Sequence, residues 1–316
     1  MTHPTSVSLV EVGPRDGLQN EAVTVSVADK VALIERLIDA GLRRIEVASF
    51  VNPKAVPQMA DAEAVVAALP ARDDLRYIGL VMNMRGYERA LATRRADGGG
   101  IDEIGCVAVA TDTFARRNQG QSRDESLAIA GDIIRRAHAD GLAAQITLSA
   151  VFGCPFEGEV DPAVVIDMAR RAADAEPDEI ALADTIGVAV PAQVTDLVGA
   201  VREAVPHIPL RAHFHNTRNT GIANAWAALG AGVAALDASI GGLGGCPFAP
   251  AATGNIATED LVYMLHRSGV ATDADLDRLI ATTQWIGARL ERDLPAQVAR
   301  AGIFPPAGPQ AERKTA

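Results

Sequence analysis

Two short stretches of the sequence carry side chains that can do chemistry together. Residues 213–215 read His-Phe-His, and residues 15–16 read Arg-Asp between glycines. In an extended strand, residues i and i+2 face the same side, so His213 and His215 would present both imidazoles to one place. With one carboxylate, such as that of Asp16, they form a donor set for a divalent ion. Two hydrogen-bonded histidines at a strand end, with no metal, are the simpler alternative.

The Arg15-Asp16 pair offers a second kind of chemistry. Neighbouring side chains point in different directions, so Asp16 can face a metal while the Arg15 guanidinium reaches toward an anion. A guanidinium keeps its proton, which suits it to the oxygen of an enolate or a carboxylate. A surface ion pair is the alternative, and for an isolated Arg-Asp pair it is the more common explanation.

Eight apolar runs that are typical of buried parallel strands could position these side chains. They cover residues 6–12, 43–50, 76–82, 103–110, 143–151, 178–184, 210–215 and 234–240. Helical patterns lie between most of them, and the clearest cover residues 27–42, 126–142, 162–175, 191–205 and 220–233. This alternation favours a (β/α)₈ TIM barrel. An open doubly wound sheet is the alternative, but no Gly-x-Gly-x-x-Gly follows the first strand.

One catalytic domain accounts for the whole sequence. We expect a single TIM-barrel domain over residues 1–316, with the barrel at about 6–268, extra C-terminal helices at about 270–300 and a polar tail to 316. Active sites of TIM barrels lie in the loops that follow the strands. Polar residues at the strand ends, including Glu46, Ser49 and Asp184, are therefore expected to meet Asp16 at one mouth of the barrel.

A glycine-rich stretch, residues 241–255, follows the eighth strand and holds Cys246. Its glycines give the backbone the freedom that an active-site lid needs. Core packing explains Cys106 within an apolar strand, but it does not explain a cysteine in such a loop. We interpret Cys246 as a thiol that acts on the substrate.

The composition limits the class of protein. The chain has 316 residues, of which 48% are hydrophobic and 22% charged, as in ordinary globular proteins. Its formal net charge of -11 disfavours nucleic-acid partners. Three cysteines without a Cys-x-x-Cys pair suit a reducing compartment. Because no targeting signal is apparent and no apolar run reaches the roughly 20 residues of a membrane span, we expect a cytoplasmic protein without a membrane partner.

Longer motifs resemble those of the 3-hydroxy-3-methylglutaryl-CoA lyase family, from about residue 7 to about residue 295. They are VEVGPRDGLQNE, IEVASFVNPKAVPQM, FGCPFEGEV, ADTIGV, HFHNT and GGLGGCPFAPAATGNIATEDLVYML. The resemblance implies a metal-dependent barrel that cleaves a 3-hydroxy-3-methylglutaryl thioester, by a retro-Claisen reaction, into acetyl-CoA and acetoacetate. It also implies an acyl-CoA as the small-molecule partner and a homodimer.

The resemblance further implies roles for individual residues. The expected metal ligands are Asp16, His213, His215 and Asn255, with Mg²⁺ or Mn²⁺ favoured and Co²⁺ or Zn²⁺ compatible. The expected catalytic residues are Arg15 as enolate stabiliser, Cys246 as an aid to proton transfer, His213 or a water near Asp184 as base, and Glu46 beside the cavity. The expected substrate contacts are Gln19, Ser49, Asn118 and Glu259.

The sequence departs from the family pattern around the mouth. Asn216 and Arg218-Asn219 follow the histidines, where well-known members continue Asp-Thr-Tyr-Gly-Gln, and Ala22 stands where some members have Lys. These changes leave the metal ligands whole and leave the acyl group open. A Claisen-type synthase or an aldolase on 2-oxo acids, and a non-catalytic barrel that binds CoA thioesters, are the alternatives. The Cys246 loop favours a lyase, because the synthase reaction leaves that thiol idle.

Overall fold

Eight parallel strands close into a barrel in the computed structural model, which describes residues 3–245 and 254–305. Each strand pairs with the next along the chain, and β8 pairs with β1 to complete the ring. The strands are β1 (Ser8–Glu11), β2 (Arg44–Ser49), β3 (Arg76–Val81), β4 (Glu103–Val109), β5 (Ala143–Ser149), β6 (Glu179–Asp184), β7 (Leu210–Phe214) and β8 (Ala235–Ala238).

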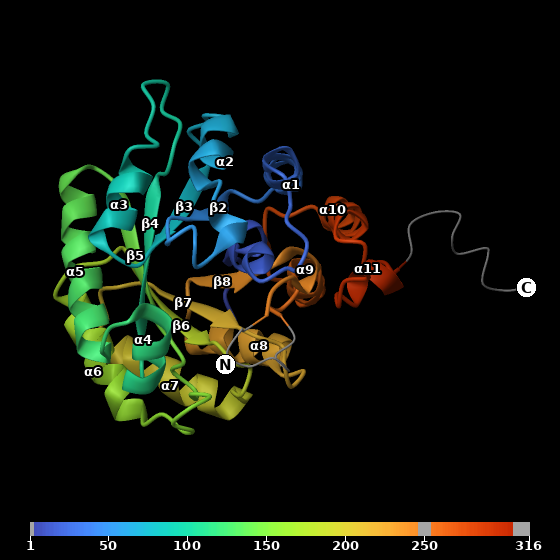
Figure 1. The fold of residues 1–316 in the computed structure, drawn as a ribbon. Helices are drawn as coiled ribbons and strands as arrows, with labels where there is room; N and C mark the ends of the chain where they lie inside the picture. Colours follow the sequence, from blue (N-terminus) through green and yellow to red (C-terminus); the bar gives the residue numbers. More distant parts are fainter. Residues whose placement is uncertain (1–2, 246–253, 306–316) are drawn as a thin grey trace, which may run out of the picture.

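Helices surround the strands, as Figure 1 shows. The α-helices are α1 (Val27–Asp39), α2 (Ala62–Ala68), α3 (Met84–Leu91), α4 (Asp112–Gln119), α5 (Arg123–Ala139), α6 (Pro162–Ala173), α7 (Pro191–Ala204), α8 (Gly221–Ala231), α9 (Thr258–Arg267), α10 (Leu276–Arg289) and α11 (Val298–Ala301). Three short turns of other helix types are η1 (Gly13–Gly17), η2 (Pro57–Met59) and η3 (Ile240–Gly242).

The predicted barrel is confirmed, and every predicted strand lies within two residues of its observed bounds. Helix α5 begins at Arg123, earlier than its apolar pattern indicated. Its first turn is fixed by a capping box, in which Ser122 accepts from the Glu125 amide while the Glu125 side chain accepts from the Ser122 amide. Helices α2, α3 and α4 were not among the clearest patterns, because seven or eight residues give few apolar repeats.

Residues on each strand alternate between two environments. On β7, the side chains of Leu210, Ala212 and Phe214 belong to the main hydrophobic core between the sheet and the helices. The alternate residues, Arg211 and His213, instead contact side chains from other strands across the barrel. The barrel interior near these positions is therefore polar, which is where a site can be built.

A buried carboxylate at the end of β1 ties two loops together. Glu11 Oε1 accepts from the amides of Gly13 and Ile240, both at 2.8 Å, and the Thr258 hydroxyl donates to Oε2 at 2.6 Å. A side chain at position 13 would place its Cβ 2.6 Å from Glu11 Oε1, so glycine is required there. This contact holds η1, which follows β1, against η3, which follows β8.

The helices after the barrel continue this support. Thr283 of α10 donates to the buried carboxylate of Glu259, whose other oxygen accepts from the Gly241 amide of η3 at 3.0 Å. On the outer side, α10 joins α1 through an ion pair between Arg289 and Asp29 at 2.9 Å. The predicted C-terminal helices therefore brace the loop after β8.

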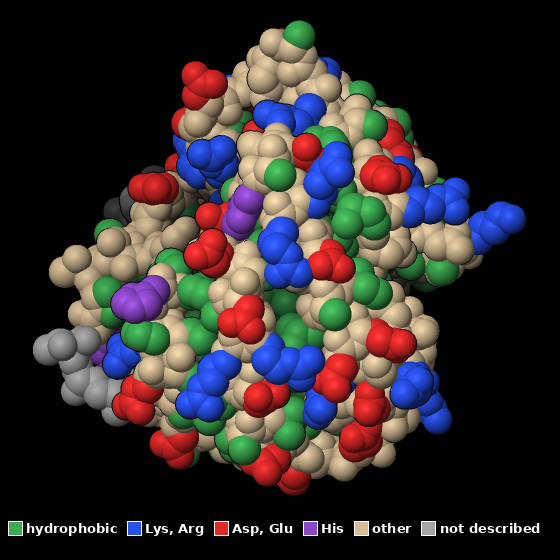
Figure 2. Space-filling model, turned by 90° about the vertical axis from the view of Figure 1, so that its left-hand side faces the viewer, with side chains coloured by type: hydrophobic (Ala, Val, Ile, Leu, Met, Phe, Trp, Pro, Cys, Tyr) green, Lys and Arg blue, Asp and Glu red, His purple; other side chains and the backbone are tan. Residues whose placement is uncertain are grey.

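The surface on the α5 and α6 side carries both signs of charge. Acidic and basic side chains are interspersed there in Figure 2, and examples are the ion pairs Arg135–Asp132 at 2.7 Å and Arg171–Asp124 at 2.8 Å. Within residues 3–245 and 254–305, no helix is both long and apolar enough to cross a membrane.

The stability of this fold should depend on pH through Glu11. Burial raises the pKa of Glu11 to about 8, although hydrogen bonds from Thr258, Ile240 and Gly13 oppose the shift. A pKa above its unfolded value gives stability that is present below about pH 4.5 and lost as the pH rises through about 8. Over this window, we expect the free energy of unfolding of the wild type to fall by about 1 kcal/mol more per pH unit than that of Glu11→Gln, because glutamine does not ionise.

Urea denaturation at pH 5.5 and 8.0, with EDTA present, measures this difference. Glu35→Gln, which changes an exposed glutamate on α1, is the control and should follow the wild type. Parallel pH dependences for the wild type and Glu11→Gln would show that Glu11 does not carry the effect.

Candidate active site

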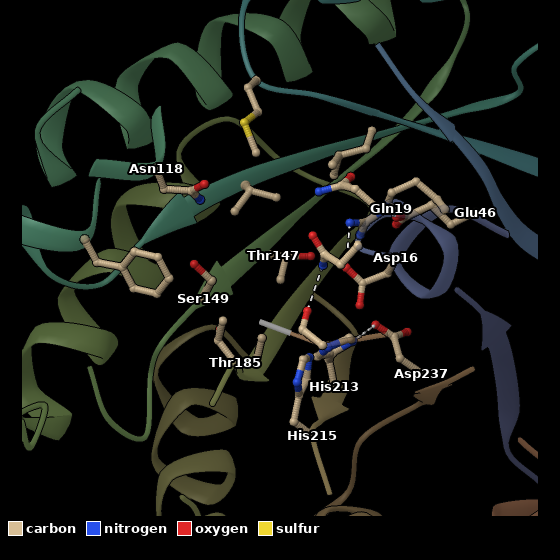
Figure 3. Close-up of a pocket in the computed structure, with 18 residues that line it drawn as sticks. Asp16, Gln19, Glu46, Asn118, Thr147, Ser149, Thr185, His213, His215 and Asp237 are labelled. Carbon is tan, nitrogen blue, oxygen red and sulfur yellow. Dashed lines mark hydrogen bonds and ion pairs between the residues drawn. The ribbon is translucent and has the colours of Figure 1, made fainter. Parts of the chain in front are cut away.

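A cavity of about 150 Å³ opens at the carboxyl ends of the strands. Five of the residues named from the sequence as catalytic or metal-binding line it, namely Arg15, Asp16, Glu46, His213 and His215, together with the expected substrate contacts Gln19 and Asn118. Figure 3 shows Asn118 and Ser149 across this cavity from Asp16 and Glu46. The structure thus brings residues of η1, β2, α4 and the end of β7 together at one mouth.

Asp16, His213 and His215 form a cluster that could hold a metal ion. One potential ligand atom from each side chain lies within 4.8 Å of the others. The two imidazoles come from alternate positions at the end of β7, with ring centroids 5.2 Å apart. Among the residues that the structure describes, this is the one group of three acidic, histidine or cysteine side chains whose potential ligand atoms lie this close together.

Each histidine of the cluster has a different electrostatic environment. His213 Nδ1 lies 3.0 Å from Asp237 Oδ2, so Nδ1 donates, and in the neutral imidazole Nε2 keeps its lone pair. Burial alone would lower the pKa of His213, but the hydrogen bond and charge of Asp237 raise it. Burial and the neighbouring His213 lower the pKa of His215 to about 4. His215 is therefore neutral at physiological pH, as a metal ligand must be.

Asp16 and Asn255 complete one side of the cluster. Burial favours the neutral acid, but Arg15 and the two histidines outweigh it and hold the pKa of Asp16 well below its usual range. The Asn255 amide donates to Asp16 Oδ2 at 2.8 Å and to the Leu243 carbonyl at 3.0 Å. This orients the carboxylate and leaves the Asn255 carbonyl oxygen without a hydrogen-bond partner.

Two buried polar atoms in or beside this cluster have no hydrogen-bond partner. They are Asn255 Oδ1 and His215 Nδ1, which lie on residues joined by an isolated β-bridge. A buried polar atom without a partner costs free energy, and a bound cation would offset that cost. The four side chains, with oxygen and nitrogen donors, therefore fit a divalent ion.

Arg15 and Asp16 follow the first strand. They lie in the π-helical turn η1, after β1 has ended at Glu11. The two side chains touch, with Arg15 Nη1 donating to Asp16 Oδ1 at 2.7 Å, so the expectation that they point apart is wrong. The Arg15 side chain is long enough to reach the carboxylate of the next residue.

Glu46 joins this pair from β2. Arg15 Nε donates to Glu46 Oε1, which forms a second ion pair in the cavity. Burial would lower the pKa of Arg15, but Glu46 and Asp16 outweigh it and raise it. Burial raises the pKa of Glu46, and Arg15 opposes that shift. A β-bulge between Glu46 and Ala48 interrupts the register with β3 at this point.

Three other expected site residues, Asp184, Ser49 and Glu259, lie outside the cavity lining. Asp184 accepts from the amides of Val188 at 2.9 Å and Ala189 at 3.0 Å, so it shapes the loop after β6. Ser49 is buried at the end of β2, and Glu259 supports η3. Cys246 falls outside the described residues, and its expected role stays a prediction.

Asp237 is the main cavity residue that was not predicted from the sequence. It lies on β8, lines the cavity and holds His213. Burial disfavours its charge, but Arg211 and His213 keep the pKa of Asp237 below its usual range. The signal was a single acidic residue inside the apolar run AALDASI. Thr147, Ser149 and Thr185 also line the cavity, and no sequence pattern marked them.

The fold and the site together define a class of protein, a (β/α)₈-barrel enzyme with a carboxylate–imidazole cluster and an arginine at its mouth. The HMGL-like family pattern matches residues 6–286. The chain is 44% identical, over 95% of its length and 96% of the relative's, to (R)-citramalyl-CoA lyase of Chloroflexus aurantiacus.

Solved structures of similar proteins have the same fold. The hydroxymethylglutaryl-CoA (HMG-CoA) lyase of Bacillus subtilis is 40% identical with a TM-score of 0.90, over 95% of this chain and 99% of that one. An HMG-CoA lyase of Acinetobacter baumannii, solved with coenzyme A and 3-methylmalate, is 38% identical with a TM-score of 0.90. The match covers 98% of this chain and 99% of that one. The chain belongs to the HMGL-like family and is a carbon–carbon lyase.

Removing one imidazole tests the cluster directly. We expect His215→Ala to weaken Mn²⁺ binding by more than about 100-fold, because a ligand matters more than the residues that orient it. Binding is measured by electron paramagnetic resonance of free Mn²⁺. His207→Ala removes an exposed histidine and should bind as the wild type does. Equal affinities in the two variants would exclude His215 as a ligand.

Proposed function

We propose that this chain is a divalent-metal-dependent acyl-CoA lyase that cleaves 3-hydroxy-3-methylglutaryl-CoA into acetyl-CoA and acetoacetate. The observation that carries the proposal is the position of Arg15 beside the cluster of Asp16, His213 and His215 in one cavity. An anion-stabilising guanidinium next to a metal donor set is what a retro-Claisen cleavage requires. Family membership favours this lyase over a condensing synthase.

The reaction needs two proton movements and one electron-pair shift. The tertiary hydroxyl loses its proton, the bond between C2 and C3 breaks, and C3 becomes a ketone. The electron pair of that bond moves to the thioester, which becomes an enolate, and a proton then adds to C2. Asp16, His213, His215 and Asn255 would hold a divalent ion, for which Mg²⁺ or Mn²⁺ suits these donors, and the ion would supply a lower pKa for the substrate hydroxyl.

Residues of the chain supply the remaining functions. Arg15 stays charged because its two carboxylate partners raise its pKa, and it stabilises the oxygen of the enolate. Glu46 accepts the hydroxyl proton, since burial raises the pKa of Glu46 and makes it a stronger base than a free glutamate. His213 acts as a ligand rather than as the base, because a nitrogen that binds a metal has no lone pair for a proton. Cys246 remains the expected donor to C2.

The size of the cavity limits what it can hold. Sites that enclose a whole drug-sized ligand measure about 300–1,000 Å³, and this cavity measures about 150 Å³. It therefore suits the acyl chain and thioester, with the rest of coenzyme A outside the mouth. A soluble homodimer in the cytoplasm stays an expectation from the family resemblance.

(R)-Citramalyl-CoA is the second candidate substrate, because the 44% identical relative is named for its cleavage. It differs from 3-hydroxy-3-methylglutaryl-CoA by one methylene between the hydroxyl-bearing carbon and the carboxylate, and it would yield pyruvate in place of acetoacetate. One methylene changes discrimination by about 10–200-fold. Both substrates keep the same bond cleavage at the same site.

A substrate panel decides between the two acyl groups. We expect acetyl-CoA release from 3-hydroxy-3-methylglutaryl-CoA to have a kcat/KM at least about 10-fold above that from (R)-citramalyl-CoA. EDTA should abolish the activity and Mg²⁺ or Mn²⁺ should restore it. The reverse preference would assign the second substrate, and full activity in EDTA would contradict the metal-dependent mechanism.

Arg15 is tested by substitutions that keep the cavity filled. Arg15→Gln should lower kcat by about 100- to 1,000-fold, as the loss of one oxyanion-stabilising donor does. Arg15→Lys keeps the charge without the planar guanidinium, and its kcat should lie between those of the wild type and Arg15→Gln. Mn²⁺ binding of both variants, measured in parallel, serves as the control for an intact site. Near-normal turnover in Arg15→Gln would remove Arg15 as the enolate stabiliser.

A further inference from the structure

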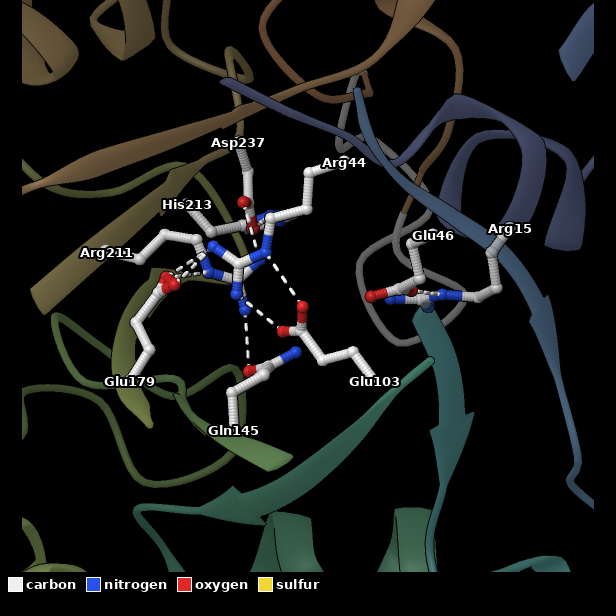
Figure 4. Close-up of polar contacts among 9 residues, drawn as sticks. All are labelled: Arg15, Arg44, Glu46, Glu103, Gln145, Glu179, Arg211, His213 and Asp237. Carbon is white, nitrogen blue, oxygen red and sulfur yellow. Dashed lines mark hydrogen bonds and ion pairs between the residues drawn. The ribbon is translucent and has the colours of Figure 1, made fainter. Parts of the chain in front are cut away.

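A network of buried charges fills the barrel interior beneath the cavity, as Figure 4 shows. Arg44 of β2 joins Glu103 of β4 and Glu179 of β6. Glu179 also lies 3.1 Å from Arg211 Nε of β7, and Arg211 Nη1 donates to Asp237 Oδ1 of β8 at 2.6 Å. The network thus runs across the barrel from Arg44 to the carboxylate that contacts His213.

Arg211 is the member of this network with the least freedom to move. Its side chain is 1% exposed. Its guanidinium is held on three sides, by Glu179, by Asp237 and by Gln145, whose Oε1 accepts from Nη2 at 2.7 Å. Nη1 and Nη2 donate hydrogen bonds to Asp237 and Gln145, while Nε contacts Glu179 as an ion pair without a hydrogen bond. A planar fork held at both terminal nitrogens fixes the direction of the hydrogen bond to Asp237.

Asp237 connects Arg211 to His213 through its two carboxylate oxygens. One carboxylate oxygen accepts from Arg211 at 2.6 Å, and the other lies 3.0 Å from His213 Nδ1. With both oxygens engaged, the plane of the Asp237 carboxylate is set by Arg211. The imidazole of His213 is then held with Nδ1 as donor and with Nε2 turned away from Asp237, on the side of Asp16 and His215.

We propose that Arg211 is a positioning residue for the metal site, which acts through Asp237 to fix the ring orientation and tautomer of His213. The proposal rests on the proposed function, in which His213 is a metal ligand. Arg211 does not itself line the cavity or belong to the cluster, and among the lining residues it hydrogen-bonds to Asp237. Its effect on the metal therefore passes through one carboxylate.

A purely structural role for Arg211 would make a different prediction. Arg44 is a matched control, because it is a second guanidinium in the same network and also contacts Glu179, but it pairs with Glu103 where Arg211 pairs with Asp237. Loss of either guanidinium removes an ion-pair partner from buried carboxylates and lowers the melting temperature. Only the loss of Arg211 releases Asp237.

The experiment compares Arg211→Gln with Arg44→Gln, and it includes Arg211→Lys in case the glutamine variant does not fold. The first readout is the Kd for Mn²⁺, measured on metal-free protein. The second is the tautomer of His213 in metal-free protein labelled with ¹⁵N-histidine, read from two-bond ¹H–¹⁵N correlations. We expect Arg211→Gln to weaken Mn²⁺ binding by about 10–100-fold and to give a mixture of tautomers.

Arg211→Lys keeps one donor to Asp237 and should lie between the wild type and Arg211→Gln. Arg44→Gln should keep the wild-type Kd and a single His213 tautomer even where its melting temperature falls. Equal losses of Mn²⁺ affinity in Arg211→Gln and Arg44→Gln would overturn the proposal, as would an unchanged tautomer in both Arg211 variants. A wild-type protein that binds no Mn²⁺ would instead contradict the proposed function.

Discussion

Closure of the barrel by the pairing of β1 with β8 is the constraint on which the site depends. This pairing places Leu9 beside Leu236 and Glu11 beside Ala238, so the chain segments after both strands start from neighbouring positions. Glu11 then ties those segments together through the Gly13 and Ile240 amides. Asp16 meets the histidines of β7 only because the ring is closed in this way.

The closed barrel also encloses charged side chains in its interior. Such groups are costly to bury unless each is paired, and here Arg211, Glu179 and Asp237 satisfy one another. An apolar interior would be easier to fold, but it would give His213 no partner for Nδ1. The polar interior thus links the stability of the barrel to the geometry of its mouth.

Arg15 has one set of partners in the structure and another in the proposed reaction. Glu46 and Asp16 hold the guanidinium in place and keep it charged. A pre-oriented cation in a small, partly dry cavity stabilises a developing anion more strongly than a mobile one in water, because little reorganisation is needed.

The sequence by itself determined the barrel and predicted that Asp16, His213 and His215 form a cluster that could hold a metal. Apolar runs buried on both faces marked all eight strands, and the His-x-His spacing fixed that His213 and His215 share a face, because both patterns are local properties of an extended chain. Short helices gave too few repeats to be read. Tertiary structure alone decided the π turn that contains Arg15 and Asp16, the turn of Asp184 toward backbone amides, and the line from Arg211 through Asp237 to His213. These depend on which strands become neighbours across the closed ring, and residue spacing along one strand carries no information about that.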